Sequence, residues 1–253
     1  MMLSIPFFKK MNLKCKKLLT NICVLIAALL FNQAVYADSA DLPEYCSLQS
    51  GLFLNGLEIL DSSGNPELDQ SISLELTHIA ESFKVLPGFG FYDDSAAKNA
   101  FAARESIIPD TRGTVIFGKQ LLANELARHK WGGLAVAGIM AHEFAHIYQM
   151  QSEFYELLLG SQPTHKLLEL HADYLAGYYL GLKRLRTNDT EIDIKAFLDS
   201  LYLKGDTHFY SRGHHGTPSE RKDAMLEGYK MGLTHNLDIH EVAIAGMNLV
   251  KKM

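Results

Sequence analysis

Two histidines and a glutamate form the motif in this sequence that is best able to do chemistry. His142-Glu143-Phe144-Ala145-His146 places two imidazoles at positions i and i+4, which share one face of an α-helix. Both rings can therefore reach one metal ion, while Glu143 lies about 100° further round the helix. Imidazoles bind Zn²⁺, the ion lowers the pKa of its water to about 7, and a nearby carboxylate can take the proton. The motif predicts a zinc hydrolase with His142 and His146 as ligands and Glu143 as general base.

The residues before this motif indicate that its helix is buried. Gly133 to Ala141 is a run of small and apolar residues that leads directly into His142. Buried polar groups without partners cost about 1–3 kcal/mol each, and a bound metal ion removes that cost. A chance match is the alternative for the five residues alone, and the apolar context argues against it.

A zinc site needs a third protein ligand. A third histidine six residues after His146 is absent, because that position is Ser152. The alternative is Glu169-Leu170-His171-Ala172-Asp173, which begins 23 residues after His146 and places Glu169 and Asp173 on one helical face. We expect Glu169 to bind the metal and Asp173 to accept the free N–H of a histidine ligand. A solvated acidic pair on a surface helix is the alternative for these two residues.

At these residues the sequence resembles the gluzincin metallopeptidases, and within them the HtpX-like and CAAX-prenyl-protease-like families. In the HtpX-like family the third ligand lies in a Glu-x-x-Ala-Asp motif, which Glu169–Asp173 matches position by position. Tyr174–Gly177 is similar to the bacterial neutral zinc metallopeptidases, and Asn99–His129 is similar to the region before HExxH in these families. The resemblance covers about residues 70–230, and the paired motifs are its specific part. It implies a zincin-like fold and zinc-dependent peptide hydrolysis.

The resemblance also implies a role for a histidine near the C-terminus. The segment from His215 to Arg221 resembles the H-P-x-x-x-x-R element of these families, although Gly216 stands where they have proline. Peptide hydrolysis needs a donor that stabilises the oxyanion of the tetrahedral intermediate. We expect His215 to be this donor, Arg221 to orient it or stabilise charge, and Tyr210 to be the second candidate. A solvated polar loop is the alternative for each of them, and we assign His171 to the structure or the surface.

Periodic apolar positions and helix caps predict a mostly helical α+β fold, a zincin-like metallopeptidase with a small sheet beside the HExxH helix. The clearest helix follows a cap at Asn65 and ends before Pro87-Gly88, and a capping box at Thr217–Glu220 begins another. We expect further helices at Lys119–His129, Leu134–Gln151, about Thr164–Leu185 and about Glu191–Leu203, and two more after the loop at Gly205–Thr217. Short strands are expected at Phe89–Phe91 and Thr114–Phe117. Thr114–Gly118 is also the expected sheet edge for pairing with an extended peptide.

The first 37 residues have the composition of an export signal. Five lysines precede an apolar run from Leu18 to Phe31, and Val35-Tyr36-Ala37 places small residues where a signal peptidase reads. We therefore expect residues 1–37 to be a signal peptide that is cleaved before Asp38. The apolar run is shorter than the roughly 20 residues of a membrane span. Membrane association through an uncleaved segment is the alternative.

Residues 38–253 are expected to form one domain, because no repeat or Pro/Gly-rich linker divides them. Removal of the signal leaves 19 basic and 29 acidic residues, a formal charge of −10, which argues against nucleic acid as a partner. Cys46 is the one cysteine of this part, so no internal disulfide is possible.

The sequence thus favours an exported zinc metalloendopeptidase, periplasmic or secreted, with one Zn²⁺ per chain and a polypeptide substrate. A deformylase-type amidase is a weaker alternative, since its usual cysteine ligand would have to be Cys46, 96 residues before His142. A zinc-stabilised binding or chaperone-like module derived from a peptidase is the non-enzymatic alternative. Glu143 argues against that module, because a structural zinc site needs no such base. The oligomeric state stays open.

Overall fold

The computed structural model describes residues 47–49, 57–96, 98–128, 131–160, 164–187, 194, 198, 215–234 and 237–253. The expected signal peptide, Cys46 and Tyr210 lie outside these ranges, and so does the helix expected at about Glu191–Leu203 apart from Ile194 and Leu198. The described elements all belong to one compact unit, Pro43–Met253. None of the helices in these ranges combines the length and hydropathy that a membrane span requires.

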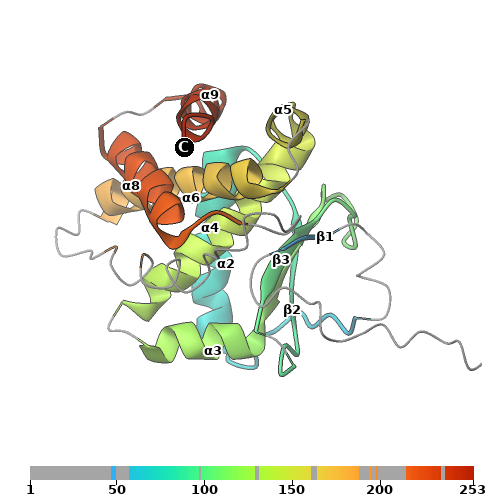
Figure 1. Cartoon of the computed structure of the whole chain (residues 1–253). Helices are drawn as coiled ribbons and strands as arrows, with labels where there is room; N and C mark the ends of the chain where they lie inside the picture. The colour runs from blue at the N-terminus through green and yellow to red at the C-terminus, as the bar shows by residue number, and fades with distance from the viewer. Residues whose placement is uncertain are drawn as a thin grey trace, which may run out of the picture. The chain divides into compact units, whose positions relative to one another are not determined.

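A small mixed sheet lies on one side of this unit (Figure 1). It has four strands in the order β1-β3-β4-β2, which are β1 (Ser47–Gln49), β2 (Gly88–Tyr92), β3 (Ala100–Ala103) and β4 (Thr114–Gly118). β2 and β4 are parallel, β3 runs antiparallel to β4, and β1 is parallel to β3. The strands expected at Phe89–Phe91 and Thr114–Phe117 are confirmed, whereas β1 and β3 were not expected.

The position of β4 corrects one expectation about substrate binding. β4 lies between β3 and β2 and is hydrogen-bonded to both, and all five of its residues are buried. An edge strand needs one unpaired side, so the expectation that Thr114–Gly118 is a free edge for a peptide is wrong. The physical reason is non-local: the strands that flank β4 come from 88–92 and 100–103, and their pairing cannot be read from β4 itself.

Two helices pack against the helix that carries the zinc motif. α2 (Pro66–Phe83) is the helix predicted after Asn65, whose side chain accepts hydrogen bonds from the N–H groups of Glu67 and Leu68. Its buried residues are Ile72, Ile79 and Phe83. α3 (Lys119–Arg128) follows β4 directly. The carboxylate of Asp94 accepts the N–H groups of Gln120 and Leu121 and thereby caps α3.

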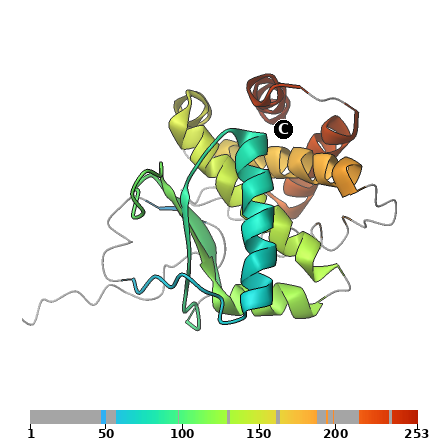
Figure 2. The same ribbon diagram turned by 180° about the vertical axis from the view of Figure 1, so that it is seen from behind.

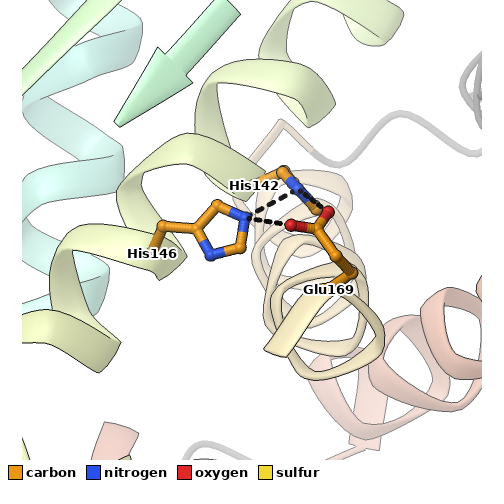
Figure 3. A group of neighbouring side chains, drawn as sticks. All are labelled: His142, His146 and Glu169. Atoms are coloured by element: carbon orange, nitrogen blue, oxygen red, sulfur yellow. Dashed lines mark hydrogen bonds and ion pairs between the residues drawn. The ribbon is translucent and has the colours of Figure 1, made fainter. Parts of the chain in front are cut away.

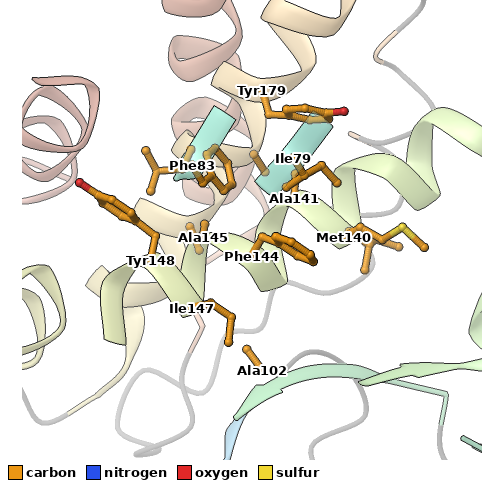
Figure 4. Close-up of a cluster of buried hydrophobic side chains, with 14 of the residues drawn as sticks. Ile79, Phe83, Ala102, Met140, Ala141, Phe144, Ala145, Ile147, Tyr148 and Tyr179 are labelled. Carbon is orange, nitrogen blue, oxygen red and sulfur yellow. The ribbon is translucent and has the colours of Figure 1, made fainter. Parts of the chain in front are cut away.

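The central helix of the unit is α4 (Gly132–Gln151), which carries the HExxH motif. Gly132 and every residue from Leu134 to Gln149 are buried, so the helix has almost no exposed face. It packs against α2, α3 and α6 (Lys166–Thr187) and against β3 and β4 (Figures 1 and 2). Figure 4 shows this core, with Phe144 and its neighbours on α4 surrounded by Ile79 and Phe83 of α2, Tyr179 of α6 and Ala102 of β3.

Three helices complete the described chain: α5 (Phe154–Leu159), α8 (Pro218–Thr234) and α9 (Ile239–Val250). The capping box expected at the start of α8 is confirmed, because the Thr217 N–H donates to Glu220 Oε2 at 2.9 Å and the Glu220 N–H donates to Thr217 Oγ1 at 3.2 Å. The described residues are therefore mostly helical with one small sheet, as expected for an α+β protein.

The backbones of α6 and α8 touch each other through glycines. Each helix presents two of them, four residues apart: Gly177 and Gly181 on α6, Gly228 and Gly232 on α8. A Cβ on Gly228 would lie 1.8 Å from the Tyr174 carbonyl oxygen, and one on Gly177 would lie 2.1 Å from that of Met225. No other residue type permits this approach. The glycines therefore hold α8 against the helix that carries Glu169 and Asp173.

Candidate metal centre

His142, His146 and Glu169 converge on one point in the core (Figure 3). The two histidines lie one turn apart on α4, and Glu169 lies in the first turn of α6. One ligand atom from each of the three residues falls within 4.8 Å of the others. His142 Nε2 lies 3.3 Å from Glu169 Oε2, and His146 Nε2 lies 3.4 Å from Glu169 Oε1. This buried group could bind a metal ion, as expected from the sequence.

The outer nitrogens of both rings face acceptors. His142 Nδ1 lies 2.9 Å from Asp173 Oδ1, and His146 Nδ1 lies 2.8 Å from Gln149 Oε1. Both Nε2 atoms therefore point inward, and they lie 3.1 Å apart. Two lone pairs at this distance repel each other unless a cation or a proton lies between them. The orientation of the rings fits a metal site, in which each Nε2 is a ligand.

Asp173 connects the first histidine to α8. The Arg221 Nε donates to Asp173 Oδ2 at 2.7 Å, and its Nη2 donates to Asp173 Oδ1 at 2.9 Å. Burial alone would raise the pKa of the Asp173 carboxyl, but the Arg221 guanidinium and the His142 ring lower it below its ordinary value. Asp173 is therefore ionised and can hold the His142 Nδ1–H. The sequence placed Arg221 beside His215, whereas its two short hydrogen bonds are to Asp173.

His215 lies beside the third ligand. Its Nδ1 is 3.3 Å from Glu169 Oε2, and Arg221 Nη2 is 3.7 Å from the same oxygen. Burial alone would raise the pKa of the Glu169 carboxyl, but the neighbouring His215 and His146 rings hold it well below its usual range. Glu169 is therefore an anion in this setting. The structure brings His215 and Arg221 to the centre, although 46 residues separate His215 from Glu169 in the sequence.

Glu143 lies fully buried beside the group on α4, about 100° round the helix from His142. The carboxylate of Glu143 affects the pKa of Tyr92, a residue at the end of β2 that the sequence did not single out. Burial raises the pKa of the Tyr92 phenol, and the negative charges of Asp94 and Glu143 raise it further. The Tyr92 hydroxyl therefore stays protonated at neutral pH.

Two further residues near the centre were not predicted from the sequence to have a role there: Gln149 and His171. Gln149 contacts His146, and its Nε2 lies 3.0 Å from Nδ1 of His171. His171 is fully buried, so its assignment to the surface is excluded. Burial lowers the pKa of His171 to about 4, which keeps the ring neutral near pH 7. The spacing of Gln149, three residues after His146 on one helix, was the signal in the sequence that could have revealed the first contact.

No family model matches the chain, and no curated protein or solved structure is significantly similar to it. The case for a function therefore depends on the residues and geometry of the site.

Proposed function

We propose that this protein is an exported zinc-dependent metalloendopeptidase of the zincin-like, gluzincin type. The observation that carries the proposal is the buried convergence of His142, His146 and Glu169, with the buried Glu143 next to His142 on the same helix. Two imidazoles and one carboxylate are a donor set typical of catalytic zinc sites, which keep a fourth position for water. A structural zinc site would use a fourth protein ligand and would not need Glu143.

Zinc is the metal that best fits these donors. Imidazole and carboxylate ligands in a three-residue set suit Zn²⁺ better than Ca²⁺ or Mg²⁺, which prefer six or more oxygens. When bound, Zn²⁺ would lower the pKa of its water to about 7 and polarise the substrate carbonyl. His142, His146 and Glu169 would hold it, and Asp173 and Gln149 would aim the two rings.

The chain's own residues would carry the proton and the charge. Glu143 takes a proton from the attacking water on its carboxylate and then gives it to the nitrogen of the leaving amine. His215 is the proposed donor to the oxygen of the carbonyl under attack, and Glu169 lies on its Nδ1 side at 3.3 Å. Arg221 acts through Asp173 by keeping that carboxylate ionised and in place.

The proposed substrate is an extended polypeptide outside the cytoplasm. The export signal expected at residues 1–37 supports the location, and the acidic mature chain argues against nucleic acid. Main-chain pairing of the substrate with β4 is not part of the proposal, because both sides of β4 are already paired.

Zinc content and cleavage of an unfolded protein, measured together on the exported protein, test this proposal. We expect one zinc per chain and cleavage that stops when the zinc is chelated. Glu143→Gln should keep the zinc and lose at least about 100-fold in rate, because the base does not hold the ion. Glu153→Gln is the matched control, since Glu153 is more than half exposed near the end of α4. Equal cleavage by the parent and Glu143→Gln would leave a zinc-stabilised binding module as the better description.

A further inference from the structure

A continuous line of hydrogen bonds runs from the metal group to the C-terminal helix. His146 Nδ1 lies 2.8 Å from Gln149 Oε1, Gln149 Nε2 lies 3.0 Å from His171 Nδ1, and His171 Nε2 lies 3.0 Å from the carbonyl oxygen of Ala243 on α9. Gln149 Nε2 also donates to the Leu168 carbonyl oxygen at 2.9 Å. The three side chains are fully buried. Each polar atom of the line therefore has a protein partner.

The direction of every bond in this line is fixed by backbone carbonyls. A carbonyl oxygen only accepts, so the Ala243 carbonyl requires the proton of His171 to lie on Nε2. The Nδ1 atom of a neutral His171 is then an acceptor, and it faces the amide N–H of Gln149. The Leu168 carbonyl imposes the same orientation on the Gln149 amide from a second side. Gln149 must consequently present its oxygen to His146.

An oxygen at this position accepts a hydrogen bond from His146 and donates none. His146 therefore keeps a proton on Nδ1, and Nε2, which faces His142 and Glu169, is the nitrogen that can bind a metal ion. A ring with its proton on Nε2 could not bind a metal ion through that atom. The tautomer of a metal-binding histidine is set in this way by the bond its other nitrogen makes.

We propose that Gln149 and His171 form a positioning pair that fixes the metal-binding tautomer of His146 and ties the metal group to α9. The pair is neutral, whereas the partner of His142 is the ionised Asp173 backed by Arg221. The two histidine ligands are thus held by different chemistry, one by charge and one by the direction of neutral hydrogen bonds. The inference rests on the proposed zinc site and concerns which ring nitrogen of His146 is left to bind the ion.

A matched pair of substitutions at residue 171 separates hydrogen bonding from packing. His171→Leu and His171→Asn remove the ring to a similar extent, and Asn alone keeps an oxygen that can accept from Gln149. We expect His171→Leu to weaken zinc affinity by about 10-fold or more, and His171→Asn to stay within about threefold of the parent. Gln149→Met should weaken zinc affinity by about 10- to 100-fold. Zinc affinity is measured by competition with a chromophoric chelator, which does not require peptidase activity.

The bond that fixes the tautomer is read from the Nδ1 proton of His146 by NMR of the zinc-free full-length protein. The parent should show this proton hydrogen-bonded to Gln149 and protected from exchange with water, and Gln149→Met should lose that protection. Phe154→Leu is the packing control, because Phe154 stacks on His171 with ring centroids 5.4 Å apart and makes no bond in the line. It should leave the protection of the His146 Nδ1 proton unchanged, even where the thermal stability falls.

Three results would overturn the inference. They are a parent protein whose His146 has no protected proton on Nδ1, equal zinc affinities for His171→Leu and His171→Asn, or unchanged protection of that proton in Gln149→Met. Failure of the proposed peptidase activity would look different, because zinc affinity and the Nδ1 proton would follow the expected pattern while no peptide is cleaved. If the variants at residue 171 do not fold, the parent spectrum and Gln149→Met still decide the matter.

Discussion

Substitution of one glycine between α6 and α8 should loosen both the fold and the metal centre. In Gly228→Ala the new Cβ would lie 1.8 Å from the Tyr174 carbonyl oxygen, and carbon–oxygen contacts normally begin near about 3.3 Å. The helices would have to separate by roughly 1.5 Å to remove the overlap. The neighbouring atom is backbone, so no side-chain rotation can relieve it.

The expected cost follows from two opposing effects. Overpacking of this severity lowers the free energy of unfolding by about 3 kcal/mol, and the better helix propensity of alanine raises it by about 1 kcal/mol. Gly228→Ala should therefore lower the free energy of unfolding by about 2 kcal/mol, which corresponds to a fall in Tm of about 4–8 °C for a domain of this size. Since Arg221 lies on α8, the separation should also stretch its 2.7 Å bond to Asp173 and weaken zinc binding.

Chemical and thermal unfolding of the zinc-free protein measure the first effect, and chelator competition measures the second. Gly133→Ala is the matched control, because Gly133 is also helical and a Cβ there meets nothing within 4 Å. It should be neutral or stabilising by up to about 1 kcal/mol. Equal stability of Gly228→Ala and Gly133→Ala would refute the close contact between the two backbones.

Three further predictions concern the centre and the start of α8. Glu169→Ala should lose most of the bound zinc, and elemental analysis showing one zinc per chain in this variant would move the third ligand elsewhere. Asp173→Ala should weaken zinc affinity by about 10- to 100-fold in chelator competition, and unchanged affinity would remove it from the support of His142. Burial alone would raise the pKa of the Glu220 carboxyl, but hydrogen bonds from Lys166 and Thr217 lower it below 4.5. The ionised carboxylate therefore stabilises the fold fully above pH 4.5, and this stabilisation is lost as the pH falls through the lowered pKa. Unfolding curves of the parent and Glu220→Gln should accordingly differ at pH 7 and converge in acid, and a constant gap would contradict this.

The helix that carries the motif could be predicted because its signals are local. The i, i+4 spacing of His142 and His146 and the apolar run before them belong to one segment, and the structure shows a buried helix there. The same spacing placed Glu169 and Asp173 on one face of α6. What the sequence could not reveal is that Asp173 would meet Arg221, because that contact joins residues 48 apart on two helices.

The sheet was harder to predict for a physical reason. β3 has the sequence Ala-Phe-Ala-Ala, in which every residue is buried, so no alternation of polar and apolar residues marks it as a strand. Whether β4 is an edge depends on its partners and not on its own residues. In the same way, the four glycines of α6 and α8 are visible in the sequence at spacings of four, but which helix faces which is decided by the tertiary fold.

Because the residues of α4 from Leu134 to Gln149 are all buried, their backbone amides can meet solvent only when the surrounding helices and the sheet come apart. Amide hydrogen exchange in α4 should therefore be the slowest among the described helices and should report the global unfolding of the unit. α9 exposes several residues, so it should exchange faster through local opening. His142 and His146 thus occupy a segment whose motion is suppressed before any ion arrives, and metal binding should slow exchange in α6 and α8 far more than in α4.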